Sequence, residues 1–251
     1  MYNIEIKMKN IEELTNNIIA WIRDWFKVNG NGCNAIIGMS GGKDSTICAA
    51  LMCAALGPDR VIGVLMPDEN QGLNDADKIC EFLHIKHIVV DITNITRAFK
   101  HNIEHSIHDT GLSKQAIMNI PPRVRMTTLY AIGQTYNGRV INTCNFSENY
   151  LGYFTIFGDS AGDMSPLGNL TVSTIYKIGD YLMIPSKWVH KTPDDGLPNS
   201  TSDEEKFGFS YEVLDKYLMY NEIPDEETMH KINDWHHRNA FKMLDISTFI
   251  P

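Results

Sequence analysis

Two glycines, two hydroxyl groups and a carboxylate lie together in the hexapeptide Ser-Gly-Gly-Lys-Asp-Ser, residues 40–45. Gly41 and Gly42 carry no Cβ, so the backbone there can turn sharply and bring its N–H groups against an anion. The hydroxyls of Ser40 and Ser45 add further donors. These residue types predict a cradle for a phosphate group. An ordinary glycine-rich turn between a strand and a helix is the alternative.

Asp44 is the residue of this hexapeptide that a plain phosphate site does not explain. Its carboxylate would repel a bare phosphate, whereas a Mg²⁺ ion can bridge carboxylate and phosphate oxygens. The hexapeptide is not a Walker motif, whose lysine follows a longer glycine-spaced run, and it is not the Gly-x-Gly-x-x-Gly of dinucleotide folds. We therefore expect a polyphosphate with magnesium at this place.

The elements that must position the hexapeptide alternate between strand and helix patterns. This alternation indicates right-handed β-α-β units and an α/β fold, an open parallel sheet with helices on both faces. Ligands of such sheets bind at the carboxyl ends of the strands, where residues 40–45 lie. Strands are expected at Ala35–Met39, Val61–Met66, His87–Ile92 and Arg139–Thr143. Helices are expected at Ile11–Phe26, Asp44–Leu56, Asn74–Leu83, Ile95–His105, Arg123–Tyr136, around Ser173–Met183, Tyr211–Tyr220 and Glu226–Arg238.

Composition narrows the classes of protein that fit the chain. Its 251 residues, 43% of them hydrophobic, suffice for a full core, and we expect residues 1–251 to form a single domain. No stretch suits a membrane helix or a signal peptide, so a cytoplasmic protein without a membrane partner is expected. The formal net charge of −9 disfavours a nucleic-acid partner. The five cysteines include no Cys-x-x-Cys pair and are expected to be reduced, packed thiols.

Beyond the hexapeptide, several segments resemble one family. The hexapeptide is similar to the Ser-Gly-Gly-x-Asp-Ser pyrophosphate loop of N-type ATP pyrophosphatases, whose fold is Rossmann-like and adenine nucleotide alpha hydrolase-like. Residues 119–126, Asn-Ile-Pro-Pro-Arg-Val-Arg-Met, resemble a signature of the NAD synthetases within that superfamily. Thr143 with Glu148, residues 152–167 and residues 202–218 resemble further signatures of that family, in its order. The sequence is therefore identified as a member of the NAD synthetase family.

The resemblance implies a reaction and its ligands. Members amidate nicotinic acid adenine dinucleotide: ATP, with Mg²⁺, adenylylates the nicotinate carboxylate, and ammonia then displaces AMP to give NAD. Free ammonia is the expected nitrogen source, because residues 1–33 ahead of the first strand are too few for an amidase domain. Three other functions stay open: a ligase acting on another acid, a nucleotide-binding regulatory module without catalysis, and a tRNA sulfurtransferase. The acidic balance and the lack of paired catalytic cysteines count against the last.

The resemblance also assigns roles to residues. The ATP-binding set is Ser40, Gly41, Gly42, Asp44, Ser45 and Thr143, and the metal ligands are Asp44 and Glu148. The substrate-binding set is Asn119, Arg123, Tyr153, Phe154, His236 and His237. The catalytic set is Asp44 with Asp159 or Asp163, one of which is expected to take the proton from the ammonia nitrogen.

Several of these residues have simpler interpretations. Arg123 on a helix is otherwise a solvated surface charge, and Tyr153 and Phe154 are otherwise core aromatics. His236 and His237 resemble the family's C-terminal His-Lys-Arg element, but positive charge also suits the end of a helix.

The chain departs from the family pattern near the expected nucleotide. Lys43 occupies the variable position of the loop and is left out of the site. Either other lysines replace the missing cations, or the substrate differs from the usual one. The departures are Leu65 for arginine, Asn145 for histidine, Val172 for lysine and Asp194 for serine or threonine, and the candidate replacements are Lys177, Lys187 and Lys191.

A homodimer is expected, as in the resembled family. The first expected helix carries a wide apolar face that would suit a subunit contact, and in a monomer this face would be ordinary core. The face consists of Leu14, Ile18, Trp21, Ile22 and Trp25.

Overall fold

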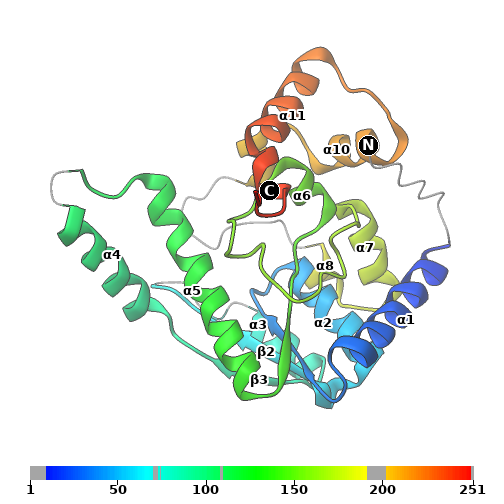
Figure 1. Cartoon of the computed structure of the whole chain (residues 1–251). Helices are drawn as coiled ribbons and strands as arrows, with labels where there is room; N and C mark the ends of the chain where they lie inside the picture. The colour runs from blue at the N-terminus through cyan, green and yellow to red at the C-terminus, as the bar shows by residue number, and fades with distance from the viewer. Residues whose placement is uncertain (1–9, 70–72, 74, 108–109, 191–201, 250–251) are drawn as a thin grey trace.

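A parallel β-sheet forms the centre of the chain in the computed structural model, which describes residues 10–69, 73, 75–107, 110–190 and 202–249 (Figure 1). Four strands lie in the order β3-β2-β1-β4, and each neighbouring pair is parallel. Each strand overlaps its predicted range, so the predicted sheet is confirmed. The strands are β1 (Asn34–Gly38), β2 (Val61–Leu65), β3 (Lys86–Val89) and β4 (Gly138–Ile141).

Helices cover both faces of the sheet, because successive side chains of a strand point to opposite sides. Ile37 of β1 packs into the larger apolar cluster, which includes side chains of α1, α2, α7 and α8. Ile36 packs into a second cluster on the other face, against Leu129 of α5. In Figure 1, α1 and α7 accordingly lie on one side and α5 on the other. The bounds are α1 (Ile11–Asn29), α2 (Lys43–Leu56), α3 (Ala76–Phe82), α4 (Thr93–Ile107), α5 (Lys114–Thr135), α7 (Val172–Tyr181) and α8 (Ser186–Val189). Asn74, the expected start of α3, lies outside the described residues.

α5 is longer than the sequence predicts. It begins at Lys114 and runs through Pro121 and Pro122, whereas the predicted helix begins at Arg123. Proline lacks an N–H group and usually ends or kinks a helix, which is why the earlier turns were not predicted. Here the Oγ of Ser113 caps the helix and supports those turns.

Four of the helices that follow β4 form a roof over the carboxyl edge of the sheet. These roof helices are α6 (Phe146–Leu151), α9 (Asp203–Phe207), α10 (Tyr211–Tyr220) and α11 (Glu226–Asn239). They share an apolar cluster of their own, which contains Leu151, Phe207, Leu214 and Ile232.

A buried carboxylate joins the roof helices to α7. Asp215 of α10 is 2% exposed. Its Oδ1 accepts the Oγ–H of Ser147, on α6, at 2.6 Å. Its Oδ2 accepts the backbone N–H and the Oγ–H of Ser173, on α7, at 2.7 and 2.6 Å. One side chain therefore connects three helices.

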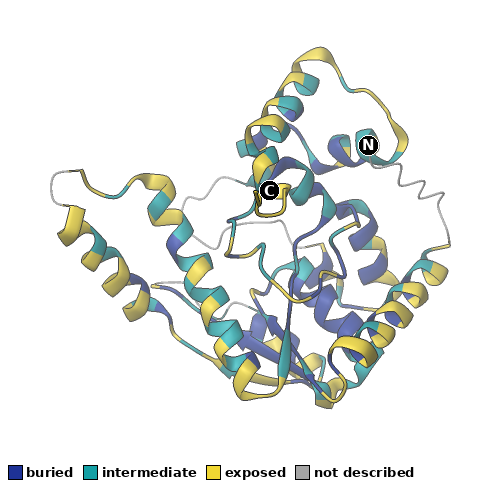
Figure 2. Cartoon of the chain, viewed as in Figure 1, coloured by how far each residue is buried: buried dark blue, intermediate teal, exposed yellow. Residues whose placement is uncertain are grey.

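The apolar face of α1 belongs to the core of its own chain. Ile19, Ile22 and Phe26 are buried, and Trp25 packs against the same cluster. The predicted dimer contact is therefore corrected to internal packing, with Trp21 as the exposed remainder. Figure 2 shows that α4 and the first turns of α5 are largely exposed instead. Within the described residues, no helix combines the length and the apolar character that crossing a bilayer requires.

Candidate active site

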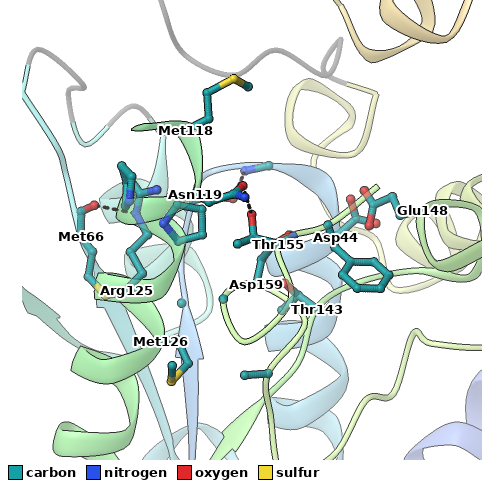
Figure 3. Close-up of a pocket in the computed structure, with 18 of the residues that line it drawn as sticks. Asp44, Met66, Met118, Asn119, Arg125, Met126, Thr143, Glu148, Thr155 and Asp159 are labelled. Carbon is teal, nitrogen blue, oxygen red and sulfur yellow. Dashed lines mark hydrogen bonds between the residues drawn. The ribbon is translucent and has the colours of Figure 1, made fainter. Parts of the chain in front are cut away.

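A cavity of about 1160 Å³ opens at the carboxyl edge of the sheet, where parallel α/β proteins bind their ligands. Its walls come from the β1–α2 loop, the segment after β2, α5, residues 140–161 and the roof helices. In Figure 3, Asp44 and Glu148 lie at one end of the cavity and Arg125 at the other, with Asn119 and Thr155 between them. Segments far apart in the sequence thus share one site.

The β1–α2 loop makes the sharp turn that its two glycines allow. Gly41 has a φ of +80°, in the left-handed region that glycine adopts without strain. The backbone N–H of Gly42 donates to Ser40 Oγ at 3.2 Å, and these three residues line the cavity. Ser45 does not line it, because its hydroxyl donates to the Gly42 carbonyl at 3.1 Å and braces the loop. The first N–H groups of α2 are oriented for an anion.

Two carboxylates approach each other beside this loop. Asn145 joins them: its Nδ2 donates to Asp44 Oδ1 at 3.2 Å, and its backbone N–H donates to Glu148 Oε2 at 3.2 Å. Burial and the negative charge of Asp44 raise the pKa of Glu148 to about 8. The positive charge of Lys43 opposes this shift, as a cation beside a carboxylate does.

The pair has the right chemistry for Mg²⁺. Proteins usually hold this ion through one or two carboxylates, with substrate phosphates and water completing the shell. In the part of the chain that the structure describes, no three His, Cys, Asp or Glu side chains form a complete metal cage. Asp44 and Glu148 therefore fit a magnesium ion that arrives with a polyphosphate.

Lys43 brings a positive charge to the same place. Its side chain is 6% exposed, and its Nζ lies 2.9 Å from Asp44 Oδ2. The ring centroids of Tyr176 and Tyr211 lie 6.0 and 5.8 Å from Nζ. Burial alone would lower the pKa of Lys43, but the charges of Asp44 and Glu148 outweigh burial and raise it. The ammonium group is therefore charged.

None of the candidate replacement lysines within the described residues reaches the cavity. Lys177 and Lys187 are exposed and do not line it. Val172, at the position of a family lysine, is buried in the roof cluster, and Leu65 forms an apolar part of the cavity wall. Lys43, which lines the cavity, is therefore a better replacement for the missing family cations than Lys177 or Lys187. Lys191 and Asp194 lie outside the described residues.

Thr155 organises the centre of the cavity. Its Oγ1 donates to Asn119 Oδ1 at 3.1 Å, and its backbone N–H donates to Asp159 Oδ1 at 2.8 Å. Desolvation raises the pKa of Asp159, while the hydrogen bonds from Thr155 oppose the shift. A carboxylate with a raised pKa in a cavity suits proton transfer. Thr143 lines the cavity as well.

Asp163, the other expected base, does not line the cavity. Its Oδ2 accepts the backbone N–H of Val140 at 2.7 Å, and its own N–H donates to the Val140 carbonyl at 2.7 Å. Its carboxylate fastens the segment after β4 to that strand. The structure therefore gives Asp163 a structural position, and Asp159 is the aspartate of this segment that reaches the site.

The two arginines of residues 119–126 face different ways. Arg123, the expected substrate ligand, is exposed outside the cavity, and its Nε donates to the carbonyl of Ile156 at 3.3 Å. Arg125 lines the cavity, and its Nε donates to the carbonyl of Met66 at 3.2 Å. Burial lowers the pKa of Arg125, opposed by the charge of Asp68. Residues two apart on a helix do not share a face, so only one of the pair can serve the cavity.

If the sequence had predicted a helix over all of Lys114–Thr135, the helical period would have favoured Arg125 over Arg123 as the arginine that lines the cavity. Side chains that line the cavity recur along α5 at intervals of three or four residues, which is the period of one helix face. They include Gln115, Met118, Pro122, Arg125 and Leu129.

Tyr153 and Phe154 line the cavity from the loop after α6. The hydroxyl of Tyr153 donates to Asp203 Oδ1 at 2.8 Å and accepts from Lys206 Nζ at 3.1 Å. Lys242 Nζ donates to the carbonyl of Phe154 at 3.1 Å. These two lysines are cations of the cavity that the sequence motifs did not reveal, because they come from roof segments without a recognisable phosphate pattern.

His236 and His237 lie outside this cavity. The ring of His236 stacks on Tyr150 with centroids 4.3 Å apart, and its Nδ1 lies 2.8 Å from the Tyr150 carbonyl oxygen. Trp235 and Asn239 of the same helix do line the cavity. The expected substrate contact of the two histidines is therefore corrected to a contact with α6 for His236 and a surface position for His237.

Known proteins resemble the chain in sequence. Residues 14–249 match the family model described as NAD synthase. The NH(3)-dependent NAD(+) synthetase of Methanocaldococcus jannaschii is 37% identical over 228 residues, which cover 89% of this chain and 86% of that protein. The corresponding synthetase of Carboxydothermus hydrogenoformans is 35% identical over 216 residues, which cover 85% of this chain and 87% of that protein.

Solved structures resemble the chain in fold. The NMN synthetase of Francisella tularensis superposes with a TM-score of 0.87 at 31% identity, covering 96% of this chain and 98% of its own. The NH3-dependent NAD synthetase of Campylobacter jejuni, in complex with the nitrate ion, superposes with a TM-score of 0.77 at 27% identity. It covers 96% of this chain and 100% of its own.

Proposed function

Because the chain belongs to the NAD synthase family, we propose that it carries out the ATP-dependent amidation of deamido-NAD by ammonia, which gives NAD. The observation that carries this function is one cavity holding the glycine loop, the Asp44–Glu148 pair and Asp159. Residues 1–251 act as one domain in this view, since the sheet and the roof helices both supply walls of the cavity.

The first step activates the acid. A carboxylate oxygen of the nicotinate group attacks the α-phosphorus of ATP, and the bond from that phosphorus to pyrophosphate breaks. The backbone N–H groups of the β1–α2 loop stabilise the negative charge that collects on pyrophosphate. Asp44 and Glu148 would hold Mg²⁺, which would supply further positive charge against the charge that develops on pyrophosphate.

The second step forms the amide. The nitrogen of ammonia attacks the carbonyl carbon of the adenylate, AMP leaves, and a proton must leave the nitrogen. Asp159 is our candidate for the group that accepts this proton, because its carboxylate lies in the cavity and its pKa is raised. Asn119, which Thr155 links to Asp159, is our candidate for the residue that orients the nicotinate ring.

A second substrate is favoured by one comparison. The NMN synthetase of Francisella tularensis superposes with a higher TM-score, 0.87, than the NAD synthetase of Campylobacter jejuni, 0.77. Nicotinic acid mononucleotide carries the same reacting carboxylate as deamido-NAD but lacks the adenylate half. Its amidation would use the same residues for both steps.

We also propose a homodimer, formed by the side of the sheet that carries β3, α4 and α5. Among the described residues β3 is an edge strand of the sheet, and an edge that is unpaired and carries apolar side chains favours association. Val89 of β3, Phe99 of α4 and Met118 of α5 are 49%, 53% and 64% exposed. Sedimentation should show a dimer, and a fully active monomer at micromolar concentration would contradict it.

The test supplies the purified full chain with ATP, Mg²⁺ and either deamido-NAD or nicotinic acid mononucleotide. Ammonium chloride is compared with glutamine in each case. NAD formed from deamido-NAD and ammonium, with AMP and pyrophosphate in equal amounts, supports the first function, and faster formation of NMN supports the second. Equal rates from glutamine would contradict ammonia dependence. If neither acid yields an amide, a ligase for another acid or a regulatory nucleotide-binding module becomes the better explanation.

A further inference from the structure

The ammonium group of Lys43 is a charged part of the cavity that the two steps above do not use. Its side chain, at the first position of α2, is 6% exposed, so it is not a solvated surface charge. An ammonium group has three N–H donors. Within the described residues, its hydrogen bond goes to Asp44 Oδ2 at 2.9 Å. Since buried donors without acceptors are costly, the remaining donors require oxygen atoms from another source.

The protein around the ammonium group offers few such oxygens. The rings of Tyr176 and Tyr211 flank it at 6.0 and 5.8 Å, and aromatic faces stabilise a cation without giving strong directed hydrogen bonds. The hydroxyl of Tyr211 is itself buried and has no hydrogen-bond partner among the described residues. Lys43 lines the cavity together with Gly42 and Asp44, so a ligand in the cavity can supply oxygen atoms to its ammonium group.

The hydrogen bonds of Asp44 show what Lys43 does there. Oδ2 is bonded to Lys43 and Oδ1 to the amide of Asn145. A divalent ion that binds Asp44 must therefore share this carboxylate with Lys43 and Asn145. In the substrate-free chain, the lysine already stands where a counter-ion of this carboxylate would be.

We propose that Lys43 is a built-in counter-cation of the Asp44–Glu148 pair that also binds the polyphosphate of ATP, so that the cavity retains phosphate affinity without a divalent ion. This role takes ATP as the ligand and so rests on the proposed function. The ammonium group neutralises Asp44 when the site is empty, and its remaining N–H groups donate to phosphate oxygens when the site is filled. Magnesium then strengthens polyphosphate binding that the lysine and the loop N–H groups have already established.

Calorimetric titration of the full chain with inorganic pyrophosphate tests the phosphate contact, in EDTA and in Mg²⁺. The wild-type chain should bind pyrophosphate in EDTA. Lys43→Met should bind at least about tenfold more weakly in EDTA, the loss expected for a charge-assisted hydrogen bond, and Mg²⁺ should restore most of the affinity. Lys177→Met, which removes an exposed lysine outside the cavity, is the matched control and should behave as wild type. A wild-type chain that binds pyrophosphate only with Mg²⁺, or equal binding by wild type and Lys43→Met in EDTA, would overturn the role.

Thermal unfolding with Mg²⁺ alone tests the counter-cation without any substrate. Lys43→Met leaves Asp44 and Glu148 unneutralised, so Mg²⁺ should raise its melting temperature more than that of wild type. A variant that folds only with Mg²⁺ supports the role in the same way, and equal increases for both proteins would overturn it. If Lys43→Met yields no folded protein, the wild-type titration in EDTA decides. These readouts need no amide formation, so they separate a failure of this role from a failure of the proposed reaction.

Discussion

The two ends of the cavity are built in different ways. The end at which we propose phosphate binding, the phosphate end, consists of residues 40–44 in one run, joined by Glu148. The end at which we propose the acyl chemistry, the acyl end, consists of Asn119 and Arg125 on α5 and Asp159 after β4, which only the tertiary fold brings together. The phosphate end can therefore be recognised from one short sequence motif. The acyl end cannot, because it depends on the rotation of α5 about its axis and on the path of the loop after β4.

The two ends also differ in electrostatics. At the phosphate end, a lysine and two carboxylates are packed together: the charges of Asp44 and Glu148 raise the pKa of Lys43, and the charge of Asp44 raises the pKa of Glu148. At the acyl end, Asp159 lies among hydrogen-bond donors, and Arg125 donates to a backbone carbonyl. Substitutions at the phosphate end should therefore change the adenylylation step as a unit, and those at the acyl end should separate into effects on catalysis and effects on binding.

The largest effect is expected for Asp44→Asn at the phosphate end. Losing the carboxylate removes the proposed metal ligand and the partner of Lys43, and pyrophosphate release with deamido-NAD should fall by about a hundredfold to a thousandfold, as for loss of a main charge-stabilising group. Circular dichroism and thermal unfolding serve as the control for an intact fold. If Asp44→Asn turns over as fast as wild type, Asp44 is not a metal ligand, and the proposed electrostatic difference between the two ends of the cavity is wrong.

Asp159→Asn should produce the next largest effect, a fall in kcat of about a hundredfold, typical of a lost general base. The base must be deprotonated to act, so activity falls as the pH falls through its pKa. Because desolvation raises the pKa of Asp159, this fall should begin at a higher pH than for an ordinary aspartate. The pH profile of kcat measures it.

Asp163→Asn is the matched control for Asp159, because Asp163 binds the backbone of β4 outside the cavity. It should lower the melting temperature and leave the acid limb of the pH profile in place. If Asp163→Asn and not Asp159→Asn loses the acid limb of the pH profile, Asp163 is the base, and lining the cavity does not identify it.

A smaller effect is expected for Arg125→Met, which should raise the KM for the acid substrate about tenfold through the loss of a charged donor, with less change in kcat. Arg123→Met removes the arginine on the other face of α5 and should leave KM near the wild-type value. Steady-state kinetics on both variants checks the rotation of α5, and a larger effect at Arg123 would contradict it.

The smallest effect is expected for His236→Ala, which lies behind the cavity wall. Loss of the hydrogen bond to the Tyr150 carbonyl should lower the free energy of unfolding by about 1 kcal/mol and leave KM unchanged. Denaturant titration and kinetics measure the two quantities. A rise in KM without a change in the free energy of unfolding would indicate that His236 does contact the substrate.

The parts that the sequence predicted well are those fixed by local rules. Buried strands such as β1 and β2 appear as apolar runs, and Gly41 marks the left-handed turn that follows β1. Position at the carboxyl edge of the sheet then follows from general properties of parallel sheets. The fold and the position of the hexapeptide at the carboxyl edge of the sheet could therefore be predicted from the sequence.

The parts that the sequence did not predict depend on orientation. Pro121 and Pro122 masked the first turns of α5, and the choice between Arg123 and Arg125 depended on those turns. His236 and Trp235 are neighbours on α11, yet only Trp235 faces the cavity. Lys43 occupies a position without a motif requirement, and only packing shows that its ammonium group meets Asp44.

Asp215 has a consequence for how the roof opens. Since its carboxylate holds Ser147 of α6 and Ser173 of α7 at once, α10 cannot detach without breaking the bonds to both. Local unfolding of this region should therefore be cooperative, with one opening free energy for the amide protons of α6, α7 and α10 instead of separate fraying of each helix. Hydrogen exchange would then report these three helices as a single kinetic unit, and the roof side of the cavity would open in one event.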